Sequence, residues 1–263
     1  MSDWASGVLV MVGATVLALA VQSIVLRRIP IEKLEAHHEV AGALIVVLGT
    51  MYGILVATVL VAVWDRYDEA QNQAGREANS TADLYRVVQH LSSPEAEKLR
   101  DLSIRYLDSV VTEEWPLLRK GQAGPRTAAI VDEMWRTTTG WQPVSAGEIN
   151  LHAAALHSVT ELAELRRHRL FRSHAVPARG VWIIMVTGAV FVIGFSYFFG
   201  LRYRFSKYIM TGALTLMIVL LLFATHELQR PFSGVAALRP YEYEVVLRML
   251  YAERARQRLG AED

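Results

Sequence analysis

Oxygen-bearing side chains gather directly after a long apolar run of this sequence. Asp65, Asp68, Glu69 and Asn72 stand at positions i, i+3, i+4 and i+7, which places them on one face of a helix. A ring of carboxylates built from several copies of such a face raises the local concentration of cations at the mouth of an ion pore. The alternative is that these side chains are simply solvated, because charged residues are common where a helix leaves the membrane. The sequence leaves both interpretations open.

A second helix face carries residue types that bind metals. His157, Glu161, Glu164 and His168 follow each other at i, i+4, i+7 and i+11. Di-iron bundles need a Glu-x-x-His spacing and matching ligands on another helix, and this sequence has neither. We therefore interpret the face as solvated and predict no metal site. Since nucleophile–base pairs, phosphate loops and cofactor signatures are also missing, we expect no cofactor and no enzymatic activity.

Four arginines precede the third apolar segment: Arg166, Arg167, Arg169 and Arg172. One interpretation is a contact with anionic lipid, worth about 1 kcal/mol per charge near a membrane surface. The other is an anchor that obeys the positive-inside rule. Both interpretations place the cluster on the cytoplasmic side.

The elements that position these residues are membrane-spanning helices. The run from Val40 to Trp64 has no charged residue, and at 1.5 Å per residue it is long enough to cross a hydrocarbon core of about 30 Å. No proline interrupts the chain from there to Leu91, so one helix is expected to leave the bilayer and continue into water. The predicted fold is an all-α integral membrane protein with four spans, at 7–26, 40–64, 180–200 and 209–228. A helical soluble domain at 65–179 separates the two helix pairs at 1–64 and 180–228, and 229–263 forms a C-terminal tail.

Small residues repeat every fourth position in the second span. Gly49, Gly53 and Ala57 form the small-xxx-small pattern that lets membrane helices approach closely. We predict a close helix contact at this stripe, either within one chain or between copies.

Composition limits the partners and the topology. The formal net charge is only +1, so nothing favours nucleic acid as a partner. Four spans put both termini and the soluble domain on the same side of the bilayer. The basic residues beside the spans are nearly balanced between the two sides, and the N-terminal flank taken alone favours a periplasmic soluble domain. The arginine cluster favours the cytoplasm for that side.

Several motifs in the chain resemble those of one family. They are His38-Glu-Val-Ala-Gly42, Val63-Trp-Asp-Arg-Tyr-Asp-Glu-Ala70, Glu77, Leu84-Tyr-Arg86, Tyr106, Glu114-Trp-Pro116 and Arg230-Pro-Phe-Ser-Gly234. In this order the chain resembles the bacterial bestrophin-like family, long labelled a domain of unknown function. The resemblance implies a helical protein of the bacterial inner membrane, grouped by analogy with bestrophins, which are pentameric anion channels with a cytoplasmic domain. The sequence departs from the family at Gln229, where an acidic residue is usual. It also lacks the acidic calcium clasp of true bestrophins after Pro240.

Two functions follow. The first is a homo-oligomeric ion channel in which the second span lines the pore and the acidic face forms its mouth. The residues favour a cation, whereas the analogy favours an anion. The second is a non-conducting membrane scaffold or sensor that recruits a partner through the soluble helical domain.

Overall fold

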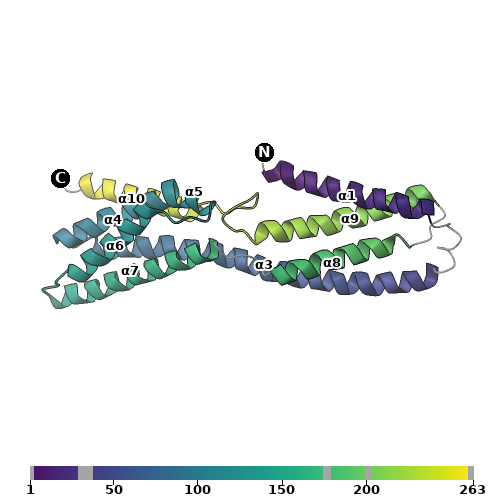
Figure 1. Cartoon of the computed structure of the whole chain (residues 1–263). Coiled ribbons are helices and arrows are strands. Elements are labelled where there is room, and N and C mark those ends of the chain that lie inside the picture. Colours follow the sequence, from purple (N-terminus) through teal and green to yellow (C-terminus); the bar gives the residue numbers. More distant parts are fainter. Residues whose placement is uncertain (1–2, 29–37, 174–178, 199–202, 260–263) are drawn as a thin grey trace. The chain divides into compact units, whose positions relative to one another are not determined.

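Every regular element of the described residues is helical (Figure 1). The computed structural model describes residues 3–28, 38–173, 179–198 and 203–259. Within these ranges the elements are α1 (Asp3–Arg28), α3 (His38–Val88), α4 (Pro94–Ser109), the π-helix η1 (Val110–Glu114), α5 (Trp115–Leu118), α6 (Pro125–Gly140), α7 (Ala146–Ser173), α8 (Arg179–Ser196), α9 (Arg204–Leu228) and α10 (Tyr241–Leu259). The predicted all-α class is confirmed. Phe199 and Gly200, the end of the predicted third span, lie outside the described residues, as do the side chains from His38 to Ala41.

The chain divides into two compact units, and four of the described helices are long and apolar enough to cross a membrane. Unit 1 comprises residues 1–66 and 176–229 and holds all of α1, α8 and α9 with the first part of α3. Unit 2 comprises residues 67–175 and 230–263. The predicted four spans are confirmed, because they correspond to α1, α3, α8 and α9.

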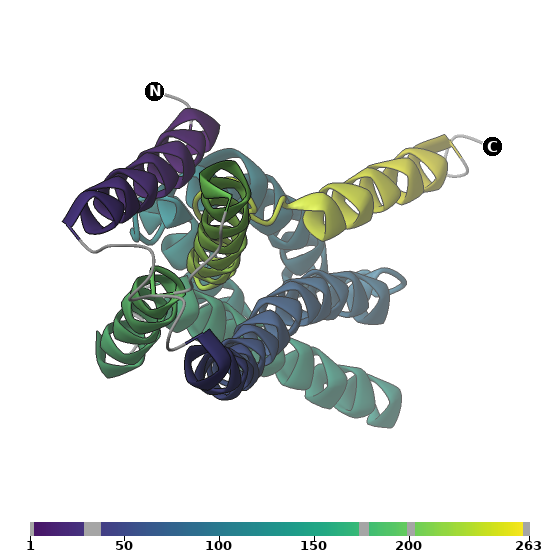
Figure 2. The same ribbon diagram turned by 90° about the vertical axis from the view of Figure 1, so that its right-hand side faces the viewer.

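The helices of unit 1 pack through small residues and a few polar contacts. The side chains of Tyr52 and Val56 on α3 are buried with Met185 and Ala189 of α8. A Cβ at Gly188 would lie 2.7 Å from Tyr52 Cδ2, so only glycine allows this approach. Helices α1 and α9 lie side by side, as Figures 1 and 2 show. The amide of Gln22 on α1 donates a hydrogen bond of 2.8 Å to Thr211 Oγ1 on α9.

Unit 2 is a helical domain around the second part of α3, which presents a narrow face of small residues to the core. Ala70, Ala74, Ala78 and Ala82 are all buried. Their small side chains let α3 approach its neighbours closely.

Local signals set the ends of two helices in unit 2. Ser93 caps α4, accepting a hydrogen bond of 3.2 Å from the Ala96 amide, and Pro94 takes the first helical position. Half of the predicted capping box at α7 forms, since Ser145 Oγ accepts from the Glu148 amide at 3.1 Å. The Glu148 carboxylate accepts from the Val144 amide at 2.8 Å, one residue before the position that the box requires.

The C-terminal segment belongs to unit 2. Residues 230–263 group with 67–175, and α10 buries Tyr243, Val246 and Leu250 in the same core. The sequence analysis treats 229–263 as a tail, because the short α10 stripe does not reveal its packing partner.

Candidate functional site

The acidic face lies on α3, and its four side chains are exposed. Asn72 Nδ2 donates a hydrogen bond of 3.0 Å to Asp68 Oδ2, and Glu69 Oε1 accepts one of 2.8 Å from Gln73. Arg172 of α7 lies 4.0 Å from Glu69. These are solvent-screened contacts within and beside one helix, and they leave most of the carboxylate surface open.

The acidic residues continue a face that α3 leaves uncovered along its apolar half. Tyr52, Val56 and Val63 are buried, whereas Thr50, Ile54, Ala57 and Val61 on the other side of the helix are exposed. At 100° per residue, Thr50, Ile54 and Val61 lie on the same side of the helix as Asp65, Asp68 and Asn72. One continuous side of α3 therefore changes from apolar to acidic at Asp65.

The stripe of small residues makes no close contact within the described part of this chain. A Cβ at Gly49 or Gly53 would meet nothing within 4 Å. Gly53 and Ala57 are exposed and Gly49 is half-buried. Helix α8 approaches α3 at Tyr52 instead. A contact of this stripe between copies stays a prediction.

The arginine cluster splits, and two of its members point into unit 2. Only 1% of the Arg169 side chain is exposed, and only 11% of the Arg166 side chain. Arg167 is exposed and Arg172 is partly exposed. This corrects the expectation of four lipid contacts, since buried carboxylates bind Arg166 and Arg169. Only Arg167 and Arg172 keep a surface for lipid.

Those carboxylates form a buried charge cluster of Glu77, Glu114, Arg166 and Arg169. Arg169 binds Glu77 in a bidentate way, with Nε and Nη2 at 2.9 and 2.8 Å from its two oxygens. The same Nη2 donates to Glu114 Oε1 at 2.7 Å. Arg166 Nη2 donates to the other oxygen of Glu114 at 2.6 Å. Two negative and two positive charges thus neutralise one another in the core.

Aromatic residues enclose the charge cluster. The hydroxyl of Tyr106 on α4 donates to Glu77 at 2.6 Å. The Arg169 guanidinium lies 5.6 Å from the Trp115 ring and 5.7 Å from the Tyr243 ring, within the range of cation–π attraction. The guanidinium is almost fully buried among these rings, and Glu77 and Glu114 are its polar partners.

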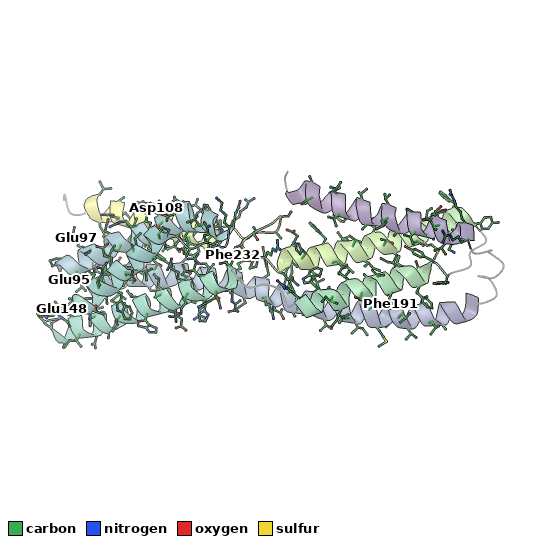
Figure 3. The ribbon with its side chains drawn as sticks, in the orientation of Figure 1. Glu95, Glu97, Asp108, Glu148, Phe191 and Phe232 are labelled. Carbon is green, nitrogen blue, oxygen red and sulfur yellow. The ribbon has the colours of Figure 1, made fainter. Side chains whose placement is uncertain are left out.

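The Arg230-Pro-Phe-Ser-Gly234 motif packs against Trp115, one of the rings beside this cluster, through Phe232. The Ser233 amide donates to the Arg230 carbonyl at 3.1 Å, and Gly234 follows with a φ of 88°, a left-handed conformation that favours glycine. Phe232, labelled in Figure 3, forms a T-shaped pair with Trp115, with 5.5 Å between the ring centroids. Five residues of the motifs in the sequence therefore meet here: Glu77, Tyr106, Glu114, Trp115 and Phe232.

The pKa values of Glu114 and Arg169 are shifted in the directions that keep both residues charged. Burial by itself would raise the pKa of Glu114, but Arg169 and Arg166 outweigh it and the pKa lies below its usual value. Burial would lower the pKa of Arg169, yet Glu77 and the other anionic neighbours keep it well above the ordinary range. Burial first, and then the charge of Glu77, raise the pKa of Tyr106 well above its ordinary value, so its hydroxyl stays protonated and donates to Glu77.

The sequence analysis missed this cluster as a unit. Glu77 and Arg169 are 92 residues apart, and no local pattern pairs them. A signal was available on α3, because Glu77 stands on the helix face that also carries Ala70, Ala74 and Ala78. A lone carboxylate on such a face requires a buried cation.

The α7 face that carries metal-binding residue types is exposed at His157, Glu164 and His168 and half-buried at Glu161. Among the described residues no group of three or more histidine, aspartate or glutamate side chains is placed to hold a metal ion. His168 lies 3.5 Å from Glu164, and Glu161 lies 3.2 Å from Arg76, both as exposed pairs.

Comparisons with known proteins agree with this architecture. Residues 12–243 match the family model of the Bestrophin-like domain. The fold is similar to crystal structures of a bacterial bestrophin homologue from Klebsiella pneumoniae. Its D269A variant matches with a TM-score of 0.72 at 14% identity, over 93% of this chain and 98% of the other. Another structure of it, phased with zinc, gives a TM-score of 0.69, also at 14% identity, over 91% and 96% of the two chains. A comparison with the curated proteins gave no match.

Proposed function

Because the chain belongs to the bestrophin-like family, we propose that it is a homo-oligomeric ion channel whose second span lines the pore. The observation that carries this proposal is the uncovered side of α3, which changes from apolar to acidic at Asp65. A helix at a pore axis presents such a side to the ion path. Gly53 and Ala57 are exposed, and a Cβ at Gly49 or Gly53 would meet nothing within 4 Å, which fits a close contact between copies at this stripe.

The acidic face gives the channel a mouth that attracts cations. In an oligomer each copy adds Asp65, Asp68 and Glu69, so the carboxylates repeat around the axis. Charges closer than a Debye length of about 8 Å at physiological salt act together, and low-dielectric walls focus their field. We infer a preference for inorganic cations. The pentameric state rests on the analogy with bestrophins.

The bacterial inner membrane is the proposed location. Unit 2 and both termini are assigned to the cytoplasm, because arginines flank α3 and α8 on that side of the spans. Arg66 and Arg179 add to the four arginines of the cluster in this count, which includes Arg166 and Arg169 although their side chains point inward.

The test measures conductance of purified protein in planar bilayers. The variant Asp65→Asn, Asp68→Asn, Glu69→Gln removes three charges per copy. It should lower cation conductance or shift the reversal potential in a salt gradient toward anions, with an effect that fades at high salt.

A matched control removes three other acids from unit 2, Glu95, Glu97 and Glu148, each replaced by glutamine. Figure 3 shows them where α4 and α7 begin. From Asp68 to Val88, where α3 ends, the helix is about 30 Å long, several Debye lengths. The control should therefore conduct like the wild type.

Two results would contradict the proposal. A wild type that passes no current at any voltage or pH favours the alternative of a scaffold or sensor. A wild type that conducts, with both triple variants indistinguishable from it, removes α3 from the pore mouth while leaving a channel.

A further inference from the structure

A half-open cavity of about 320 Å³ lies in unit 2, beside the charge cluster but separate from it. Its walls are α3, α5, the segment before α10, and the first turn of α10. Tyr67, Trp115 and Tyr241 are among the lining residues, so three aromatic side chains border one small space. The volume stands at the lower end of the range for ligand sites, which suits a small molecule.

The walls of this cavity are held in place. The Tyr67 hydroxyl donates a hydrogen bond of 2.8 Å to the Ala236 carbonyl. The Trp115 indole donates one of 3.0 Å to the Leu238 carbonyl. Both bonds connect a helix to the segment that leads into α10, so the cavity is preformed.

Two opposite charges border the cavity without pairing. Arg239 is exposed and Glu242 is half-buried, and both side chains contribute to the lining. Neither has an ion pair or a side-chain hydrogen bond with the described residues. The stem of Glu242 lies over Gly75 of α3, where a Cβ would be 3.7 Å from its Cγ. A guanidinium and a carboxylate thus line the same pocket.

We propose that this cavity binds a small zwitterion with an alkylated ammonium group. Arg239 binds the ligand carboxylate, because a guanidinium matches a carboxylate with two parallel donors. Glu242 and the aromatic rings bind the ammonium group, through charge and through cation–π attraction. A ligand with one charge leaves either Arg239 or Glu242 unpaired.

The test titrates full-length protein in lipid nanodiscs by calorimetry, with glycine betaine as the probe. Choline supplies the cation alone, and propionate the anion alone. We expect saturable binding of betaine and at least roughly tenfold weaker binding of each single-charge probe, since hydrogen bonds to charged groups contribute about 1.5–3 kcal/mol.

Four single variants locate the site. Arg239→Gln and Glu242→Gln should each weaken betaine binding by roughly tenfold or more. Glu244→Gln and Arg248→Gln change exposed side chains of the same helix that do not line the cavity, and they should bind like the wild type. The proposal is overturned if betaine does not bind, if choline binds as tightly as betaine, or if the control variants weaken binding equally.

Discussion

Arg169 connects three elements of unit 2 through one guanidinium. It extends from α7 to Glu77 on α3 and to Glu114 on η1. A buried ion pair adds little net stability compared with apolar side chains of the same shape, because desolvation offsets the attraction. Removal of one partner is different, since it leaves a charge buried without a counterion. The pairing therefore acts mainly by fixing which faces of α3, η1 and α7 meet.

The first prediction concerns the loss of this arginine. Arg169→Met leaves Glu77 and Glu114 short of a cation and should lower the free energy of unfolding by about 3–5 kcal/mol. Arg76→Met is the matched control, because Arg76 forms an exposed pair with Glu161 at 3.2 Å and should cost about 0–1 kcal/mol. Thermal melting in detergent compares the two variants. Equal melting temperatures would show that the cluster does not hold unit 2 together.

The second prediction concerns pH. The folded pKa of the Glu114 carboxyl lies below its ordinary value of 4.5, so its contribution to stability is complete above that value. This contribution is lost as pH falls through the lowered folded pKa, because the Glu114 carboxyl binds a proton more readily in the unfolded chain than in the folded protein. The melting temperature should stay level from about pH 7 to 5 and fall below the ordinary value. Glu114→Gln should flatten this fall, and an unchanged slope would assign acid sensitivity to other carboxyls.

Buried charged residues whose partners are distant in the chain are the part of the candidate site that the sequence does not predict. The spans, the caps at Ser93 and Ser145 and the acidic face depend on periodicity and local chemistry, which the sequence displays directly. The partner of Glu77 depends on tertiary packing across 92 residues. The inward position of Arg166 and Arg169 follows from the same packing, and an arginine run next to a span gives no sign of it.

At the scale of elements, α3 differs from the other helices in belonging to both units. It is 51 residues long, and each unit buries a different segment of one side of it. In unit 1 that side carries Tyr52 and Val56, and in unit 2 it carries small alanines. The absence of proline was enough to predict from the sequence that this helix continues across residue 66. The uncovered side of α3, in contrast, can be identified only from the positions of α8 and the unit 2 helices.

The third prediction separates the two kinds of glycine in unit 1. Gly188→Ala forces a Cβ to 2.7 Å from the Tyr52 ring and should lower the melting temperature of the subunit. Gly53→Leu meets nothing within 4 Å in the described part of the chain at its Cβ and should leave the subunit fold intact. If the stripe joins copies, Gly53→Leu should instead reduce the oligomer mass, measured by light scattering with detergent subtracted. An unchanged mass would remove the stripe from the interface.

At the scale of the whole molecule, four spans require the loop between the third and fourth spans to lie opposite unit 2. The orientation depends on the positive-inside rule, which counts arginines near the ends of the spans whichever way their side chains point. The inward position of Arg166 and Arg169 therefore does not remove them from the count. It does remove them from direct contact with lipid, so Arg167 and Arg172 carry any electrostatic attraction to the membrane surface.

The last prediction tests this topology with single cysteines, which are unique labels because the chain has none of its own. Ala123→Cys places a thiol in the exposed loop before α6, next to Gly121, whose φ of 66° makes that glycine a poor site for substitution. Ser206→Cys places one in the exposed first turn of α9. A maleimide that cannot cross membranes should label Ser206→Cys in intact cells and label Ala123→Cys only after the cells are opened. Labelling of Ala123→Cys from outside would assign unit 2 to the periplasm, and labelling of both variants from the same side would contradict four spans.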